Sequence, residues 1–258
     1  MKIVLLAGGL GTRLREETEF RPKPMVNIGG KPILWHLMKY FSHFGYDDFI
    51  ICAGYKSEVI KDYFLNFDYR NSDFTVTLGI RSNIEVHTKE TEPWKITIVD
   101  TGQETLTGGR IAKIKEYINE SVFMVTYGDG LSNVDLDKLL DFHKSHGKIA
   151  TVTSVQQPSR FGMVESTKDG LVLKFEEKPH SEDWINGGFF VFNSNIFEYL
   201  NPEQMLETST LQYLVSIGEL MAFKHHDFWQ PMDTYRESEI LNRLWEKNIA
   251  PWKVWDSR

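Results

Sequence analysis

The chain opens with a short apolar run that ends in a cluster of glycines. Residues 3–6 read Ile-Val-Leu-Leu, and residues 7–14 continue as Ala-Gly-Gly-Leu-Gly-Thr-Arg-Leu. Because glycine has no Cβ, Gly8, Gly9 and Gly11 let the backbone turn sharply and approach a bulky anion. Main-chain N–H groups in such a turn can converge on phosphate oxygens. This opening predicts a β-strand followed directly by a phosphate-binding loop.

Two cationic side chains stand near this loop in the sequence. Arg13 offers a planar set of N–H donors that suits phosphate. Lys23 lies between two prolines, which restrict the backbone on both sides, so its ammonium loses little freedom on binding. The loop, Arg13 and Lys23 together predict a triphosphate-binding site.

Two familiar phosphate loops do not match these residues. A P-loop requires Gly-Lys followed by Ser or Thr after its last glycine, whereas Gly11 is followed by Thr12 and Arg13. A dinucleotide fingerprint that starts at Gly9 requires glycine or alanine where Leu14 stands. It also expects an acidic residue about 20 positions later. NAD binding is therefore weakly supported.

Strand-like and helix-like patterns alternate through the first half of the chain. Residues 49–53, 122–126 and 149–155 are apolar runs of strand length, and residues 33–44 carry apolar side chains at helical spacing. Such alternation is typical of an α/β sheet with crossover helices. Residues 74–99 carry β-forming residues in several pieces, which predicts a sheet extension or a hairpin arm.

The second half has a different character. Antiparallel strands are predicted at 161–165, 171–176 and 188–192, with a Lys-Asp-Gly turn at 168–170. Further elements are predicted as helices at 196–200 and 211–217, a strand at 220–224, and a last amphipathic helix around 240–245. We therefore expect one α/β domain with a Rossmann-like, mixed, mostly parallel sheet flanked by helices. Its expected parts are a nucleotide-binding half (1–155), a smaller antiparallel sugar-phosphate-binding half (156–233), and a C-terminal helix and tail (234–258).

Composition excludes several classes of function. The 258 residues include 29 basic and 36 acidic side chains, a formal charge of −7, and no dense basic stretch, so nucleic-acid binding is disfavoured. The one cysteine, Cys52, lies in an apolar run and is expected to be a buried strand thiol. No segment approaches the ~18 apolar residues of a membrane span, and the opening apolar run ends in glycines instead of a cleavage site. We expect a cytoplasmic protein.

Two aspartates follow predicted strands. Asp129 lies between two glycines directly after the run at 122–126, and Asp233 precedes the last predicted helix. A carboxylate at the carboxyl end of a strand points into the crevice where α/β proteins bind ligands, and carboxylate oxygens suit Mg²⁺. The residues alone also allow a turn role for Asp129 and a helix N-cap role for Asp233.

Two later segments carry groups that suit a phosphorylated sugar. Residues 175–179, Phe-Glu-Glu-Lys-Pro, end a predicted strand with a lysine held before proline, and residues 186–188 place an asparagine amide beside two glycines. An amide donor and acceptor beside bare backbone suits a polyhydroxyl ligand. The residues alone are equally consistent with a solvated charge cluster and a strand-entry turn.

Taken together, these motifs resemble the signature of the sugar-nucleotide pyrophosphorylases, a nucleotidyltransferase family. The glycine loop indicates only the superfamily, and later segments are more specific. They are Glu-Pro-Trp at 92–94, Val-Asp-Thr-Gly at 99–102, Thr-Gly-Gly-Arg at 107–110, Thr-Tyr-Gly-Asp-Gly at 126–130, Asn-Gly-Gly-Phe-Phe at 186–190 and Phe-Trp-Gln-Pro-Met-Asp-Thr at 228–234. The resemblance runs nearly end to end and is closest to the branch that uses CTP and glucose 1-phosphate.

This resemblance implies an Mg²⁺-dependent enzyme that joins a nucleoside monophosphate to a sugar 1-phosphate and releases pyrophosphate. It implies metal ligation by Asp129 and Asp233, and catalytic roles for Arg13, Lys23 and Asp129. The implied nucleotide contacts are Leu6, Ala7, Gly8, Gly9, Leu10, Gly11, Thr12, Arg13, Lys23, Thr105, Gly108, Gly109, Arg110 and Gly128. The implied sugar-phosphate contacts are Glu177, Lys178, Asn186 and Gly187. Whether Arg110 binds phosphate or an oxygen of cytosine is left open.

The resemblance also implies a homo-oligomer that supplies sugar nucleotides for O-antigen lipopolysaccharide. UTP or dTTP in place of CTP is the alternative within the enzyme class, and a non-catalytic sugar-nucleotide sensor is the alternative from another class. Residues 205–211 depart from the family pattern, with Leu206 in place of an expected tryptophan and Thr210 in place of a proline. A structural or surface role is expected for His225 and His226, and packing or subunit contacts are expected for Trp245, Trp252 and Trp255.

Overall fold

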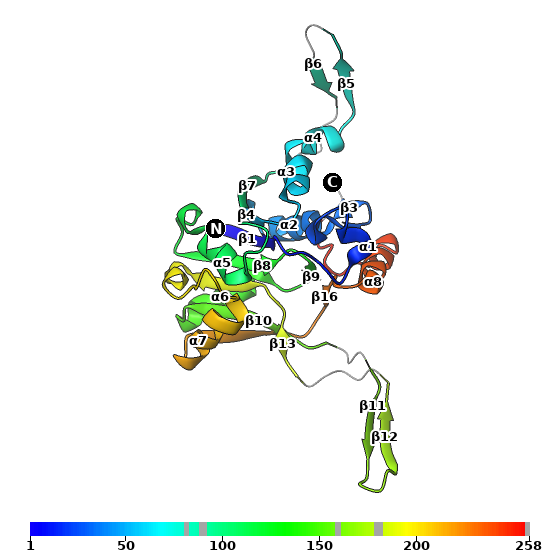
Figure 1. Cartoon of the computed structure of the whole chain (residues 1–258), viewed down its shortest axis with the longest axis vertical. Helices are drawn as coiled ribbons and strands as arrows, with labels where there is room; N and C mark the ends of the chain where they lie inside the picture. Colours follow the sequence, from blue (N-terminus) through cyan, green and yellow to red (C-terminus); the bar gives the residue numbers. More distant parts are fainter. Residues whose placement is uncertain (80–82, 88–91, 158–160, 178–182, 256–258) are drawn as a thin grey trace.

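The computed structural model describes residues 1–79, 83–87, 92–157, 161–177 and 183–255. Figure 1 shows a central body of sheet and helices from which two hairpins project at opposite ends. Lys178, one of the predicted sugar-phosphate contacts, lies outside the described residues.

An eight-stranded sheet forms the centre of the body, in the order β13-β10-β14-β8-β1-β4-β7, with β15 also paired to β10. Its strands are β1 (Lys2–Ala7), β4 (Asp48–Ala53), β7 (Lys95–Asp100), β8 (Val122–Tyr127), β10 (Ala150–Val155), β13 (Ile185–Asn186), β14 (Phe190–Asn193) and β15 (Leu220–His225). Strands β7, β4, β1 and β8 run parallel to one another, and β14 joins β8 to β10 through antiparallel pairings. The sheet is therefore mixed and mostly parallel in its first-half portion, as predicted.

Strand register brings two predicted site segments to one edge of the sheet. In the pairing of β1 with β8, Leu6 lies opposite Tyr127. The glycine loop leaves β1 at Ala7, and Asp129 follows the end of β8. Because the two strands are parallel, both segments begin at the same edge, where open α/β sheets bind ligands.

Helices cover both faces of the sheet because side chains alternate along each strand. Ile3 and Leu5 of β1 belong to one core cluster, and Val4 and Leu6 belong to the other. The first cluster contains side chains of α2 (Ile33–His43), α3 (Ser57–Leu65), α6 (Leu136–His146) and α8 (Tyr235–Glu246). The second contains side chains of α5 (Thr107–Ala112), α7 (Leu211–Ser216), the 3₁₀ turn η3 (Ser194–Glu198) and the π-helical turn η4 (Leu206–Thr210).

Short elements complete the body. They are α1 (Arg15–Thr18), η1 (Lys23–Met25), α4 (Phe67–Arg70), η2 (Lys115–Tyr117), the pair β2 (Asn27–Ile28) and β3 (Lys31–Pro32), and the pair β9 (Gly130–Ser132) and β16 (Trp229–Pro231). The helix predicted at 196–200 is the 3₁₀ turn η3, which has the same length and begins two residues earlier. Among the described residues, no helix is long and apolar enough to cross a membrane.

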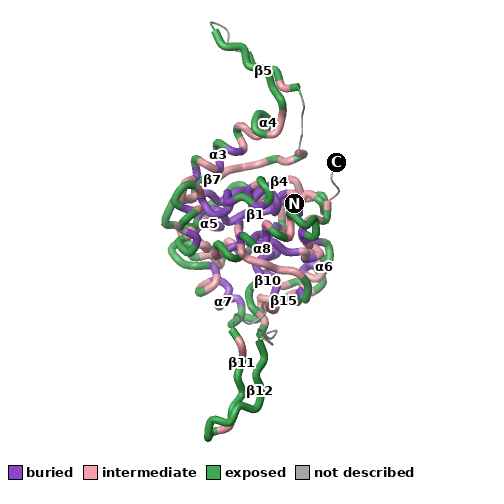
Figure 2. The backbone as a smooth tube through the Cα atoms, turned by 90° about the vertical axis from the view of Figure 1, so that its right-hand side faces the viewer, coloured by how far each residue is buried: buried purple, intermediate pink, exposed green. Residues whose placement is uncertain are grey.

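Both projecting hairpins are two-stranded sheets of their own. One pairs β5 (Phe74–Thr77) with β6 (Asn83–Val86), and the other pairs β11 (Met163–Ser166) with β12 (Val172–Glu176). Their surfaces are largely exposed in Figure 2. Leu173 and Phe175 are 61% and 66% exposed. The strands predicted at 161–165 and 171–176 therefore form, but in an arm away from the sheet. We define the two hairpins as the first arm (β5–β6) and the second arm (β11–β12).

Trp252, Trp245 and Cys52 pack against other side chains, as predicted. Trp252 is fully buried, and its Nε1 donates a hydrogen bond of 3.3 Å to Nδ1 of buried His36. The ring centroids of Trp245 and His36 are 4.6 Å apart. Cys52 is buried, and burial raises the pKa of its thiol to about 12. These residues anchor the C-terminal segment and the sheet core.

Candidate active site

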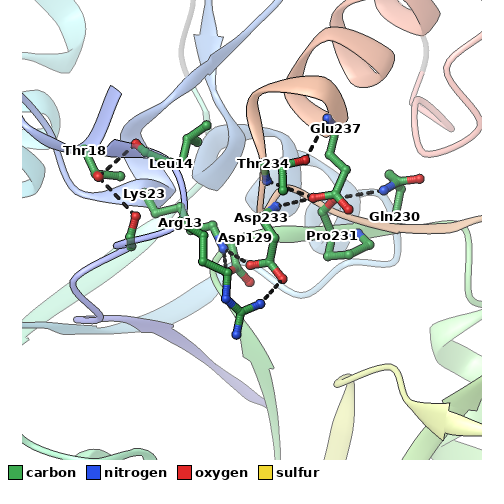
Figure 3. Close-up of polar contacts among 11 residues, drawn as sticks. Arg13, Leu14, Thr18, Lys23, Asp129, Gln230, Pro231, Asp233, Thr234 and Glu237 are labelled. Carbon is green, nitrogen blue, oxygen red and sulfur yellow. Dashed lines mark hydrogen bonds and ion pairs between the residues drawn. The ribbon is translucent and has the colours of Figure 1, made fainter. Parts of the chain in front are cut away.

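Four side chains predicted to share one site meet in the structure (Figure 3). The ammonium of Lys23 lies 2.7 Å from Oδ2 of Asp129 and also contacts Oδ1 of Asp233. Nη1 of Arg13 lies 2.9 Å from Oδ2 of Asp233. We call Arg13, Lys23, Asp129 and Asp233 the charge cluster.

A small strand pair brings the two aspartates together. Pro231 of β16 lies opposite Gly130 of β9 in an antiparallel pairing. The N–H of Met232 donates to the carbonyl of Asp129 at 2.8 Å. Asp233 therefore emerges next to Asp129 although more than a hundred residues separate them in the sequence.

Asp233 is not the N-cap of α8, so that alternative is wrong. The cap is Thr234, whose hydroxyl accepts from the N–H of Glu237 at 3.3 Å while the Glu237 carboxylate accepts from the N–H of Thr234 at 2.8 Å. This reciprocal capping box satisfies the helix terminus without the Asp233 side chain. The Asp233 carboxylate instead faces Lys23 and Arg13 (Figure 3).

The two cations of the charge cluster differ in exposure. Lys23 begins η1 and is 8% exposed, whereas the Arg13 side chain is 73% exposed. Burial alone would lower the pKa of the Lys23 ammonium, but its ion pairs, with Asp129 first and then Asp233, outweigh burial and raise the pKa. Lys23 therefore stays charged, while Arg13 can swing toward a ligand at little cost.

The donor set of the charge cluster fits a magnesium ion. Carboxylates of Asp129 and Asp233 both turn toward a single cation, which here is the Lys23 ammonium. No group of three or more His, Cys, Asp and Glu side chains with metal-binding geometry occurs within the described part of the chain. Mg²⁺ usually needs only one or two carboxylates because phosphate oxygens and waters complete its shell.

The glycine loop lies beside these four residues. Gly9, Leu10 and Thr12 are exposed. Gly11 has a φ of +63°, a conformation that disfavours residues with a Cβ. The hydroxyl of Thr18 donates to the carbonyl of Gly11, at 3.1 Å, and also to that of Leu14. Thr18 braces the loop, and nothing in its local sequence marked it for this role.

Arg110, one of the implied nucleotide contacts, lies against the start of the glycine loop. It is 4% exposed, and its Nη1 and Nη2 atoms donate to acceptors of its own chain. These are the carbonyls of Gly8 (2.9 Å), Ala53 (3.3 Å), Gly102 (2.8 Å) and Gln103 (3.1 Å), and the hydroxyl of Thr101 (2.6 Å). The guanidinium so engaged braces the main chain at Gly8 against residues 101–103.

Gly108 and Gly109, two of the implied nucleotide contacts, are buried at the start of α5. A Cβ on Gly109 would lie 2.2 Å from the carbonyl oxygen of Pro202. These glycines therefore allow residues 201–206 to approach α5. Nearby, the hydroxyl of Thr105 donates to the carbonyl of Thr101 at 2.5 Å.

Gly128 joins the two halves of the predicted site. Its N–H donates to the carbonyl of Leu6 at 2.9 Å, so the turn before Asp129 is tied to the end of β1. A Cβ there would lie 2.9 Å from that same carbonyl oxygen. The contact fixes the start of the glycine loop relative to Asp129.

Asn186 and Gly187, two of the implied sugar-phosphate contacts, lie beside the end of β8. Nδ2 of Asn186 donates to the hydroxyl of Tyr127 at 3.0 Å, and the carbonyl of Gly187 accepts from Nε1 of Trp229 at 2.7 Å. Glu177 directly follows β12 and is exposed. Sequence reasoning missed Tyr127, although it directly precedes the Gly128-Asp129 pair.

The sequence matches the nucleotidyl transferase family over residues 2–234. It is 51% identical to the glucose-1-phosphate cytidylyltransferase of Salmonella typhimurium, across 99% of this chain and 100% of that protein. It is 43% identical, with the same coverage, to a Bacillus subtilis protein named probable glucose-1-phosphate cytidylyltransferase. The crystal structure of HddC from Yersinia pseudotuberculosis complexed with GMP-PN is 25% identical, with a TM-score of 0.68 over 95% of this chain and 99% of that chain. These likenesses confirm the predicted fold class.

Proposed function

Because the chain belongs to the nucleotidyl transferase family, as its motifs predicted, we propose that it forms CDP-glucose and pyrophosphate from CTP and glucose 1-phosphate. The observation that carries this proposal is the meeting of Arg13, Lys23, Asp129 and Asp233 beside the glycine loop. Relatives that bear the name glucose-1-phosphate cytidylyltransferase support the choice of both substrates.

In this proposal the residues 8–13 bind the β- and γ-phosphates of CTP. An oxygen of the acceptor phosphate attacks the α-phosphorus in line, and pyrophosphate leaves. Lys23 offsets the negative charge that gathers around the α-phosphorus, and the exposed Arg13 turns to the leaving group. The acceptor is already an anionic nucleophile, so no covalent enzyme intermediate is needed. Catalysis is then positioning plus electrostatic stabilisation.

Asp129 and Asp233 would hold Mg²⁺, which when bound neutralises phosphate charge and favours in-line displacement. Before that, their carboxylates are neutralised by Lys23 and Arg13. Substrate binding therefore exchanges ion pairs within the chain for ion pairs to phosphate. Lys23 is released from one carboxylate as it turns to the nucleotide.

The base and the hexose occupy opposite sides of this cluster in the proposal. We assign Arg110 a positioning role, because it holds the main chain at Gly8 and at residues 101–103, from which backbone groups read cytosine. Asn186, Gly187, Glu177 and Lys178 bind the hexose phosphate.

The two arms are the contact surfaces through which we propose that copies of the chain assemble. An isolated two-stranded hairpin is marginally stable in water, and the second arm exposes large apolar side chains such as Leu173 and Phe175. Pairing with a second copy would cover these side chains and the open strand edges. Light scattering should show smaller particles for Phe175→Glu than for the wild type. Val215→Glu, at an exposed apolar position of the body, is the matched control.

The reaction is tested by pyrophosphate release with four NTPs crossed with several hexose 1-phosphates. CTP with glucose 1-phosphate should give the highest rate, and chelation of divalent cations should stop it. Faster release with UTP or dTTP would change the assigned nucleotide. Tight binding of CDP-glucose with no pyrophosphate release from any pair would instead indicate a sugar-nucleotide sensor.

A further inference from the structure

One carboxylate outside the charge cluster connects two segments of the proposed site. Oε1 of Glu207 accepts a hydrogen bond of 2.5 Å from the hydroxyl of Tyr127, and Oε2 accepts one of 2.7 Å from the hydroxyl of Thr107. Tyr127 ends β8, next to the Gly128-Asp129 pair, and Thr107 begins α5. We call Thr107, Tyr127, Asn186 and Glu207 the Glu207 network.

The hydrogen bonds toward Asn186 have a defined direction. An ionised carboxylate only accepts, so the Tyr127 O–H must donate to Glu207. The Tyr127 oxygen then accepts from Nδ2 of Asn186 at 3.0 Å, and Oδ1 of Asn186 accepts from the N–H of Gly188 at 2.9 Å. Glu207, through Tyr127, and the N–H of Gly188 therefore hold the Asn186 amide in one orientation, and Glu207 does so without touching it.

The other oxygen of Glu207 holds the start of α5. Because Thr107 gives its hydroxyl proton to Glu207, its oxygen accepts from the N–H of Leu206 at 2.9 Å. Gly109 allows the same segment to pack on α5, since a Cβ there would collide with the Pro202 carbonyl. One side chain thus links α5 to the amide at the hexose side.

The unusual sequence at 205–211 leaves this link intact. Leu206 and Thr210 stand where the family pattern has tryptophan and proline, and both are buried. The hydroxyl of Thr210 donates to the carbonyl of Tyr199 at 3.1 Å. Glu207 lies in the π-helical turn η4 between them, a type of turn that often occurs at functional sites. Both departures are therefore accommodated in the interior, and the Glu207 carboxylate keeps its contacts with Tyr127 and Thr107.

We propose that Glu207 is a positioning residue that selects the hexose, because it orients the Asn186 amide through Tyr127. This inference rests on the proposed function, in which Asn186 contacts the hexose 1-phosphate. A correctly oriented amide presents one remaining N–H and one lone pair to hexose hydroxyls. An epimer with a hydroxyl in another position would not match them.

Glu207→Gln tests the inference because glutamine has the same shape but adds an N–H donor that can reverse the relay. The KM for glucose 1-phosphate should rise about tenfold, the effect of losing a hydrogen bond to a charged group. Preference for glucose 1-phosphate over galactose 1-phosphate, measured as kcat/KM, should fall by a similar factor. The KM for CTP and the melting temperature should change little.

Tyr127→Phe removes the middle of the relay and should reproduce the loss of preference. Glu203→Gln is the matched control, because Glu203 is an exposed glutamate near the same turn, and it should leave both KM values unchanged. Unchanged hexose preference in Glu207→Gln, beside an active wild type, would overturn this inference alone. So would equal losses for CTP and glucose 1-phosphate together with a lower melting temperature. A wild type without pyrophosphate release from any hexose 1-phosphate would overturn the proposed function as well.

Discussion

The charge cluster and the Glu207 network are built from similar side chains in opposite ways. The charge cluster pairs two cations with two carboxylates, and one of its cations is largely exposed. The Glu207 network surrounds a single carboxylate with neutral donors, and its contacts are hydrogen bonds of 2.5–3.0 Å. Ion pairs are weakly directional and can be exchanged for phosphate or metal, whereas a hydrogen-bond relay specifies geometry. The first arrangement suits chemistry on phosphorus, and the second suits selection of a substrate.

The largest expected effect is on the charge cluster. Lys23→Ala should lower kcat about a hundredfold or more, the effect of losing one electrostatic contact to a transition state. Steady-state rates of pyrophosphate release would measure it. Lys144→Ala, on the exposed side of α6, is the control and should be fully active. Normal turnover in Lys23→Ala would contradict the proposal that the charge cluster carries the chemistry and the Glu207 network selects the substrate.

Metal dependence should be confined to the charge cluster. Chelation should abolish wild-type activity, and added Mg²⁺ should restore it. Asp129→Asn should raise the Mg²⁺ concentration for half-maximal activity about tenfold or more, because Mg²⁺ prefers charged oxygen ligands. The same titration on Glu207→Gln should match the wild type. A shift of equal size in Glu207→Gln would contradict the separation of roles.

Double variants test whether two residues act together. The effects of residues in contact should be non-additive, whereas the effects of residues in different clusters should add. Tyr127→Phe removes the hydrogen bond of 2.5 Å that Glu207→Gln can reverse, so their effects on kcat/KM should be non-additive by about 1 kcal/mol. Arg13→Ala and Glu207→Gln should add within about 0.5 kcal/mol, because their side chains belong to different sets of contacts. Strong non-additivity of Arg13→Ala and Glu207→Gln would contradict the description of the two clusters as independent.

The smallest expected effect is on stability at high pH. The folded chain holds the proton of Tyr127 above its ordinary pKa of 10.0. The unfolded chain releases that proton first, so the associated stability is complete below pH 10 and is lost as pH rises above it. Urea unfolding at pH 8 and at pH 10.5 measures this loss. Between these two values the free energy of unfolding should fall by about 1 kcal/mol less in Tyr127→Phe than in the wild type. Tyr117→Phe, at an exposed position, should follow the wild type.

Lys23 titrates with the same sign, because its raised pKa also places the loss of its contribution above the ordinary value of 10.5. Lys23 and Tyr127 should therefore both keep their protons at neutral pH. If the loss of a proton from Lys23 or Tyr127 limited activity below pH 9, the ion pairs of Lys23 and the hydrogen bonds of Tyr127 would be contradicted.

The sequence alone determined the order of elements and the residues of the charge cluster. Apolar runs such as residues 3–6 and the helical spacing at 33–44 report local periodicity, which needs no knowledge of distant neighbours. Motifs of the glycine loop, with Lys23, Asp129 and Asp233, are short and local as well. Their family resemblance was therefore readable before any contact was known.

Only the tertiary structure decided which role each residue takes when its type allows more than one. Arg110 braces main chain, Gly109 lets another segment approach, and Thr234 takes the cap that Asp233 was also suited to fill. The apolar pattern of β11 and β12 predicts strands but cannot say that they leave the body as an arm. Glu207 meets Tyr127 across 80 residues of chain. Such meetings depend on strand register and helix packing, which local periodicity does not encode.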